Sequence, residues 1–272
     1  MEIVIKPKNK WWQIDFRELW RFRDLTYFFA WRDFKVKYKQ TIIGVLWVVF
    51  QPFITMVVFT VFFGNLAKIP SDNIPYPIFV YTGLLFWTFF STSLSNASNS
   101  FTLNEGIITK IYFPKIIMPV ASIVTSIIDF AVAAVIFAFM MVFYHYTPSI
   151  TGLLLLPLLI IMTMLSSLGI GLLLASLNVK YRDVRYILPF FIQLLIFVTP
   201  VIYPVSIVSP ENRWILGLNP MSGIINAARS GLLGGSPIDW TLLGISAVSM
   251  IVYCLIGFVY FRMVEKYFAD VI

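Results

Sequence analysis

Charged residues divide this sequence into long apolar intervals, and this spacing is its most informative pattern. Six intervals contain no Asp, Glu, Lys or Arg: 40–67, 73–104, 116–128, 130–179, 186–210 and 240–261. About 20 apolar residues in a helix cross the roughly 30 Å hydrocarbon core of a bilayer. A water-soluble domain would need charged surface along these stretches, so the pattern predicts an all-α integral membrane protein.

Apolar length and helix-breaking residues together predict six transmembrane helices. The expected spans are Thr41–Phe63, Ile78–Ser100, Ile116–Tyr144, Ile150–Leu177, Ile187–Ile202 and Leu242–Phe261. The fifth is short and ends in a segment that contains Pro200 and Pro204. We expect one membrane domain over 1–272, made of an N-terminal segment 1–40, a bundle 41–262 and a tail 263–272.

Composition and charge agree with this architecture and orient it. Hydrophobic residues make up 59% of the chain and charged residues 12%, whereas about 25% charged residues is typical of soluble domains. Of the 20 Lys and Arg residues, all but Lys68, Arg213 and Arg229 fall on the side that holds both termini. Cytoplasmic loops carry the excess of such residues, so both termini are predicted to be cytoplasmic.

Two segments outside the spans are unusually apolar. In Phe16–Lys39, aromatic residues follow a helical spacing and basic residues occupy other faces, which favours a helix in the headgroup plane over a merely basic tail. Between spans five and six, the segment Pro204–Ser236 is apolar but broken at Asn219-Pro220. It predicts two short re-entrant helices, with an interfacial hairpin as the alternative.

The predicted cytoplasmic loops and one buried acid carry the candidate polar chemistry. The loop Asn178–Arg185 is short and charged; it either sets topology or forms a docking surface, and the loop Leu103–Lys115 lies on the same side. Asp129 lies inside the third span, where a carboxylate must face the bundle or water. A structural hydrogen bond is the favoured role, ahead of proton coupling.

Enzymatic motifs are missing from the sequence. It has one histidine, His145, one cysteine, Cys254, and no G-x-x-x-x-G-K-[ST] loop. We therefore predict no catalytic residue, no metal site and no cofactor bound by this chain. A membrane enzyme that acts on polyprenyl-linked sugars stays open as the alternative from a different class.

Aromatic side chains are abundant, with 26 Phe, 13 Tyr and 8 Trp. Many of them should face lipid or gather at the membrane interfaces. A subset that lined a pore could stack on sugar rings without demanding one sugar sequence. The candidates are Trp47, Phe50, Tyr81, Trp87, Phe90 and Phe197, and for each one lipid-facing packing is the alternative.

A series of short motifs, in a fixed order over nearly the whole chain, resembles a known family. The motifs are Arg32–Tyr38, Gly44–Trp47, Pro52, Asn104–Ile108, Phe113–Lys115, Asn178, Tyr181–Val184, Thr199–Pro204, Asn219-Pro220 and Arg229. Together they resemble the permease subunit of polysaccharide ABC exporters of the O-antigen and teichoic-acid type, within the type-2 exporter permeases. Each motif is weak alone, and their order carries the resemblance.

The resemblance implies partners, a substrate and a location. It implies a homodimer in the bacterial inner membrane and two copies of a separate ATPase subunit, which would bind ATP and Mg²⁺. The implied cargo is a polyprenyl-linked glycan that moves from the cytoplasm to the periplasm, and membrane lipids are further partners. No nucleic-acid partner is expected. Export of teichoic acid, drugs or small lipids by the same fold is the alternative.

The resemblance also implies three groups of site residues. The first would couple to the ATPase: Asn178, Lys180, Tyr181, Arg182, Asp183 and Arg185. The second would form a gate at the cytoplasmic entrance: Asn104, Glu105, Lys110 and Lys115. The third would meet the lipid pyrophosphate: Arg32, Lys35 and Lys39.

Overall fold

The computed structural model describes residues 16–39, 42–181, 183–265 and 268. Within these residues the chain is helical and has no strand, which confirms the prediction that the fold is all-α. The α-helices are α1 (Phe16–Arg21), α2 (Arg23–Tyr38), α3 (Ile42–Phe59), α4 (Tyr76–Leu103), α5 (Glu105–Ile108), α6 (Ile117–Phe143), α7 (Ile150–Lys180), α8 (Val184–Val198), α9 (Arg213–Gly217), α10 (Pro220–Leu233) and α11 (Trp240–Val264). A π-helix, Thr60–Leu66, extends α3, and short 3₁₀ turns lie at Val205–Ile207 and Pro210–Asn212.

Five helical segments of the described chain are long and apolar enough to cross a membrane. They are Leu46–Leu66, Tyr76–Leu103, Ile117–Phe143, Ile150–Lys180 and Trp240–Val264, which match five of the six predicted spans. The expected fifth span corresponds to α8, whose 15 residues rise about 22 Å. This is less than the roughly 30 Å of hydrocarbon, so six full-length spans are not established.

Proline chemistry accounts for the short α8. Thr199, directly before Pro200, has φ −80° and ψ 138° and is therefore extended. A residue before proline is pushed out of the helical region because the proline ring collides with its backbone. The helix ends at Val198, four residues before the predicted boundary at Ile202.

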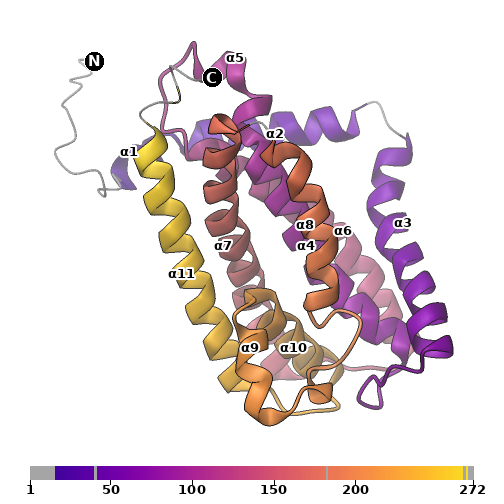
Figure 1. Cartoon of the computed structure of the whole chain (residues 1–272). Helices are drawn as coiled ribbons and strands as arrows, with labels where there is room; N and C mark the ends of the chain where they lie inside the picture. Colours follow the sequence, from indigo (N-terminus) through magenta and orange to yellow (C-terminus); the bar gives the residue numbers. More distant parts are fainter. Residues whose placement is uncertain (1–15, 40–41, 182, 266–267, 269–272) are drawn as a thin grey trace.

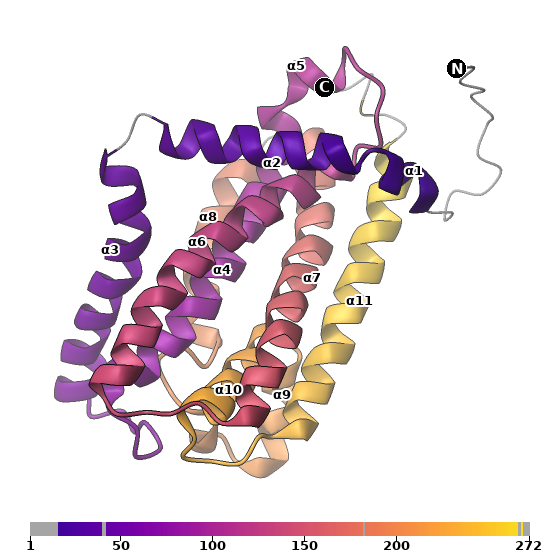
Figure 2. The same cartoon turned by 180° about the vertical axis from the view of Figure 1, so that it is seen from behind.

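The long helices run side by side between two distinct ends of the molecule (Figure 1). At one end, which we call the α2 end, α2 lies across the ends of the long helices (Figure 2). Helix α5 and the last turns of α7 and α11 lie at the same end. The short helices α9 and α10 occupy the opposite end, which we call the α10 end. The predicted N-terminal segment Phe16–Lys39 is thus helical, but it forms two helices, α1 and α2, that are separated at Phe22. Its position in the headgroup plane stays a prediction.

Helix α4 forms the centre of the bundle and α3 stands at its edge. In the most apolar window of α4, 78% of the residues are buried, whereas the corresponding share in the α3 span is 11%. Helix α4 packs against α6, α7 and α10, and α11 packs against α7. Helix α3 therefore presents most of its apolar surface outward, to lipid or to another chain.

Glycine pairs allow α7 to approach its two neighbours closely. A Cβ atom built on Gly257 of α11 would lie 1.9 Å from the backbone oxygen of Gly169 in α7. A Cβ atom on Gly152 of α7 would lie 2.0 Å from the backbone oxygen of Gly231 in α10. Small residues at such crossings let helix backbones pack tightly where the hydrophobic effect is absent.

The α9–α10 hairpin reaches from the α10 end toward the middle of the bundle. Ser249 Oγ donates to the backbone oxygen of Gly217 at 2.9 Å, and Tyr253 Oη donates to that of Leu218 at 3.1 Å. Helix α11 begins at Trp240, so at 1.5 Å per residue these contacts lie about 14 and 20 Å along it. A re-entrant pair requires this depth, and its insertion into lipid stays a prediction.

Candidate functional site

The α2 end brings together two predicted groups, the cations of the expected lipid entrance and the expected gate residues of the loop Leu103–Lys115, which we call the gate loop. Arg32 of α2 donates from Nη2 to Asn104 Oδ1 at 2.6 Å, directly before α5. The same guanidinium pairs with Asp33 at 2.6 Å. Lys35 and Lys39 are exposed, and Lys35 Nζ lies 5.3 Å from the centroid of the Trp31 ring. Arg32 therefore fastens α2 to the gate loop, whereas the two lysines face outward.

The remaining gate-loop residues divide into exposed and anchored side chains. Glu105 and Lys110 are exposed on α5 and the turn that follows it. Lys115 Nζ donates to the backbone oxygen of Glu265 at 3.0 Å and lies 5.2 Å from the centroid of the Phe268 ring. The loop is therefore tied at its far end to the C-terminal end of α11. Its exposed part at Glu105 and Lys110, which we call its tip, is accessible to another molecule.

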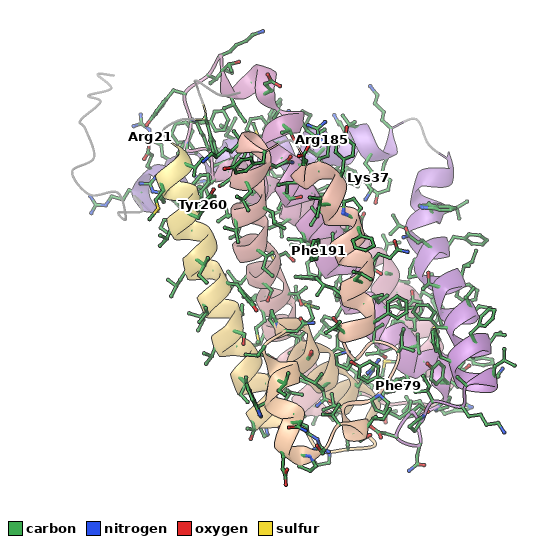
Figure 3. All side chains as sticks on the ribbon, in the orientation of Figure 1. Arg21, Lys37, Phe79, Arg185, Phe191 and Tyr260 are labelled. Atoms are coloured by element: carbon green, nitrogen blue, oxygen red, sulfur yellow. The ribbon has the colours of Figure 1, made fainter. Side chains whose placement is uncertain are left out.

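The predicted coupling residues also divide by exposure. Lys180, Tyr181, Asp183 and Arg185 are exposed at the α2 end, where Figure 3 places Arg185. Arg182 lies outside the described residues.

Asn178, the first of the predicted coupling residues, is buried. Its side chain is 1% exposed and donates from Nδ2 to the backbone oxygen of Ser98 at 3.2 Å and to Asn99 Oδ1 at 3.1 Å. Asn178 thus holds α7 against α4. A side chain in this position cannot touch a docked subunit while that contact persists, so we leave it out of the proposed docking surface.

The six candidate channel aromatics separate into an interior set and an outer set. Tyr81, Trp87 and Phe90 on α4 are 0%, 5% and 2% exposed. They pack inside the chain, and the Tyr81 hydroxyl donates to the backbone oxygen of Ala133 at 3.1 Å. The outer set, on α3 and α8, is more than half exposed and consists of Trp47, Phe50 and Phe197.

Asp129 meets two side chains of α2 at the α2 end of the bundle. Lys37 Nζ lies 2.5 Å from Asp129 Oδ2, and the Tyr38 hydroxyl donates to Asp129 Oδ1. Burial raises the pKa of Tyr38 well above its usual range, and the hydrogen bond and the negative charge of Asp129 raise it further. Asp129 therefore makes the structural hydrogen bond that the sequence favoured. The sequence analysis did not identify these partners, because it took the aromatic residues of the segment Phe16–Lys39 only as the sign of a helix in the headgroup plane.

Arg229 forms the tightest polar cluster at the α10 end. It is 5% exposed and donates to four backbone oxygens, those of Phe79 (3.1 Å), Pro200 (2.6 Å), Val201 (2.6 Å) and Tyr203 (3.4 Å). These bonds join α10 to α4 and to the irregular segment after α8. The sequence offered one signal for such a role, since an arginine in an apolar region needs buried partners.

A family model settles the kind of protein that carries these features. The model for the ABC-2 type transporter matches residues 24–233, from α2 to the end of α10. The chain belongs to the ABC-2 type transporter family. Membership implies that this permease works with an ATPase subunit. The match includes the α2 contacts, the gate loop, the 178–185 loop and Arg229.

Curated relatives of this ABC-2 transporter chain cover most of its length. It is 25% identical over 241 residues to the O-antigen export system permease protein RfbA of Klebsiella pneumoniae, with 89% of this chain and 92% of the relative aligned. It is 29% identical to the protein of the same name from Myxococcus xanthus, with 78% and 81% aligned. It is 21% identical to the polysialic acid transport protein KpsM of Escherichia coli, with 86% and 91% aligned.

Proposed function

We propose that this chain is the membrane permease of a polysaccharide exporter of the O-antigen type. Two copies would form the translocation path, and two separate ATPase subunits would drive it. The observation that carries the proposal is the family match over residues 24–233, joined to relatives whose names specify O-antigen export and polysialic acid transport. The cargo is a polyprenyl-linked glycan that moves from the cytoplasmic to the periplasmic leaflet.

The proposed ATPase docking surface is the exposed part of the 178–185 loop together with the tip of the gate loop. Lys180, Tyr181, Asp183 and Arg185 are exposed at the same end of the bundle as α5, which carries exposed Glu105. These charges lie between the end of α7 and the start of α8, so force applied there would reach both helices of the bundle. Both positive and negative side chains are available to pair with a soluble partner.

The proposed entrance for the lipid pyrophosphate lies on α2. Lys35 on this helix and Lys39 directly after it are exposed, and the helix lies across the end of the bundle. Clustered cations attract anionic headgroups, and Arg32 connects this surface to Asn104 of the gate loop. A headgroup that bound at α2 would therefore act directly on the gate.

Exposed aromatic residues on α3 and α8 support the proposed homodimer. Trp47 and Phe50 on α3, together with Phe197 on α8, are 57%, 52% and 53% exposed. Two copies that met along these helices would cover them and would place aromatic rings beside the path. We propose these three residues for the channel lining and leave out Tyr81, Trp87 and Phe90, which are buried within one chain.

The proposed orientation follows the charge distribution. The α2 end carries the cation-rich segments, so we place it, with both termini, at the cytoplasmic face of a bacterial inner membrane. The α10 end then faces the periplasm, and α9–α10 dips into the membrane from that side. The mid-bundle contacts of Gly217 and Leu218 support this placement.

Deletion of the gene in its host tests the proposal. We expect loss of a surface polysaccharide and accumulation of the lipid-linked glycan inside the cell, with recovery on complementation. Intact surface polysaccharide in the deletion strain would contradict the proposal. Increased drug sensitivity or a changed phospholipid distribution, with normal polysaccharide, would favour the small-molecule alternative. An altered glycan structure without retention would favour a membrane enzyme.

A further inference from the structure

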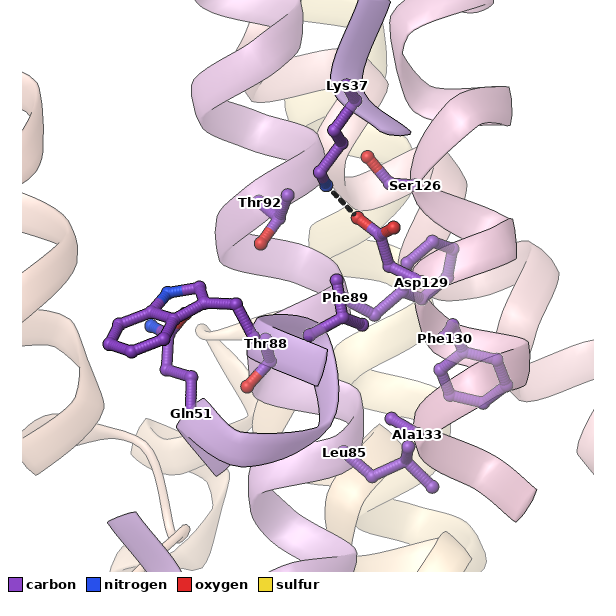
Figure 4. A pocket seen from close by; sticks show the side chains of 12 residues that line it. Lys37, Gln51, Leu85, Thr88, Phe89, Thr92, Ser126, Asp129, Phe130 and Ala133 are labelled. Atoms are coloured by element: carbon purple, nitrogen blue, oxygen red, sulfur yellow. Dashed lines mark hydrogen bonds and ion pairs between the residues drawn. The ribbon is translucent and has the colours of Figure 1, made fainter. Parts of the chain in front are cut away.

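A pocket of about 460 Å³ lies beneath the C-terminal end of α2, between α3, α4 and α6. Figure 4 shows it from close by, with the Lys37–Asp129 ion pair at its upper edge. Phe89 and Phe130 line its inner wall. The volume falls within the range of about 300–1,000 Å³ that small-ligand pockets occupy. It is therefore large enough for one or two sugar rings and too small for a folded chain.

Three polar side chains in the wall of this pocket make no hydrogen bond within the described residues. Gln51 of α3, and Thr88 and Thr92 of α4, belong to its wall. Among the described residues, the side chains of these three make no hydrogen bond, although Thr82 on the same helix bonds to a backbone oxygen one turn earlier. One amide and two hydroxyls are thus available to a ligand. Polar side chains at membrane depth are costly and are expected where they face a wet cavity or a function.

The charge in the pocket is balanced. Lys37 and Asp129 form an ion pair, and the Asp129 side chain is 12% exposed. An incoming phosphate would meet a carboxylate together with a cation that is already paired, so it would gain little net attraction. A neutral hydroxylated ligand can exchange hydrogen bonds with both groups without separating charge. The chemistry of the pocket therefore favours neutral polyols.

An exposed indole completes the wall. Trp47 lines the pocket from α3 and is 57% exposed. The flat apolar face of an indole accommodates the C–H face of a sugar ring, while the hydroxyls at the ring edge bond to amides and carboxylates. A large aromatic surface with a few convergent polar groups is typical of small-ligand sites. Here these elements converge from four helices, α2, α3, α4 and α6.

A polar route joins this pocket to the gate loop. A second pocket, of about 550 Å³, is lined by Arg32, Asn104 and Asn96, and Lys37 lines both pockets. On α4, polar residues recur every four positions between the two: Thr88, Thr92, Asn96 and Ser100. Residues at this spacing share one helix face. Asn96 Nδ2 also donates to Ser126 Oγ of α6 at 3.3 Å, in the wall of the inner pocket.

We propose that the pocket beneath α2 is a carbohydrate site, which binds one or two neutral sugar residues of the exported glycan next to its lipid-linked end. This inference rests on the proposed function and adds a location and a chemical class. The Lys37–Asp129 pair and the Trp47 indole would contact the sugar directly. The exposed lysines of α2 would hold the pyrophosphate outside the pocket.

Binding of defined sugars to the full-length chain in lipid nanodiscs, together with its ATPase subunit, tests this site. The probes are lactose, maltose and cellobiose, with glucose 1-phosphate as the anionic comparison, and saturation-transfer difference NMR is the readout. We expect saturation transfer to the ring C–H protons of at least one neutral disaccharide. Saturation transfer to the ring protons of glucose 1-phosphate should be weaker. Preferential binding of glucose 1-phosphate would overturn the proposal, because it would show an anion site.

Matched variants locate the signal. Trp47→Leu and Thr92→Val should each weaken binding about tenfold, equivalent to one good contact, and Trp47→Phe should retain most of it. Trp214→Leu is the control, because Trp214 is 53% exposed on α9 at the other end of the chain. An equal loss in the control, or no loss in the pocket variants, would overturn the site. Size-exclusion chromatography verifies that each variant is folded.

The outcome separates this inference from the proposed function. ATP turnover measured in the same preparation and surface polysaccharide measured in cells report on the permease assignment, whereas saturation transfer to a disaccharide reports on the pocket. Coupled export without transfer to any sugar would remove the carbohydrate site and leave the permease assignment intact. Saturation transfer to a sugar, in a chain for which no ATPase partner is found, would keep the carbohydrate site and remove the permease assignment.

Discussion

Arg229 lies on Phe79, with its guanidinium carbon 3.6 Å from the centroid of the ring and its Nε donating to the Phe79 backbone oxygen at 3.1 Å. The same guanidinium bonds to the segment that follows α8. A Cβ atom on Gly83 would lie 2.6 Å from Arg229 Nη2, so the site has no room to spare. Arg229 thus fixes the irregular segment against the central helix.

Replacement of Arg229 by Ala should destabilise the protein strongly. It leaves several buried carbonyl groups without a donor, and each unsatisfied group costs about 1–3 kcal/mol. We expect a loss of at least about 3 kcal/mol in total, measured as a lower apparent melting temperature in detergent. The melting temperature of Arg229→Lys should lie between those of the wild type and Arg229→Ala, because one ammonium group cannot reproduce the planar fork of donors.

Arg213 provides the control for this change. Its Nε donates to one backbone oxygen, that of Val208, at 3.1 Å, and its side chain is partly exposed. Arg213→Ala should cost no more than about 1 kcal/mol, the net value of one ordinary hydrogen bond. Equal melting temperatures for the two alanine variants would contradict the role given to Arg229.

The close crossing of α7 and α11 predicts a second stability effect. Gly257→Val should force the helices apart, because a Cβ atom there meets the Gly169 backbone at 1.9 Å. Overpacking of this kind costs about 1–3 kcal/mol or more. Gly244→Val on the same helix is the control, since a Cβ atom at Gly244 has no atom within 4 Å. A thermal shift assay compares the two, and equal shifts would show that the crossing is not tight.

Much of the fold was predictable because bilayer length constrains each span. The uncharged intervals in the sequence predicted the positions of the five long helices. This prediction did not require knowledge of which helices pack together, because the length of each span is set by the bilayer. The limits were local. Thr199 and Pro200 set the end of α8 through backbone sterics, and this shortened a span that apolar composition alone had extended to Ile202.

The site was less predictable because its contacts join residues distant in sequence. An acid inside an apolar span, Asp129, indicated that a polar partner must lie nearby. The sequence around Asp129 did not identify that partner, because Lys37 lies 92 residues away. The sequence analysis grouped Asn178 with the charged loop that follows it. In the structure α7 continues to Lys180, past the predicted end at Leu177, and the side chain of Asn178 is buried. The burial of Tyr81 on α4 likewise depends on neighbours that only the assembled bundle supplies.

Cysteine accessibility tests the orientation of the bundle. In a Cys254→Ser background, single cysteines at Glu211 and Ser236, which flank the hairpin, should react with an impermeant maleimide applied to spheroplasts. A cysteine at Lys110, exposed at the α2 end, should react only after permeabilisation. Labelling in the reverse order would invert the topology. Labelling of the first two positions from opposite sides would rule out the re-entrant hairpin.

Reversing one charge in the 178–185 loop tests coupling to an ATPase. Asp183 is exposed at the start of α8, so Asp183→Lys should leave folding intact while it disrupts a complementary contact. We expect binding of the ATPase subunit to weaken at least about tenfold, equivalent to about 1.4 kcal/mol, and surface polysaccharide to fall, with normal membrane levels of the protein. Glu211→Lys, an exposed reversal at the α10 end, should leave export unchanged. Normal export by the Asp183 variant would remove this loop from the docking surface.

The most direct test of the permease assignment is purification of this chain in mild detergent with the product of a neighbouring ATPase gene. The assay then measures complex mass and ATP turnover. We predict a stable complex of two permease and two ATPase chains that hydrolyses ATP. A permease that purifies without any ATPase, from every candidate gene tested, would contradict the account and reopen the membrane-enzyme interpretation.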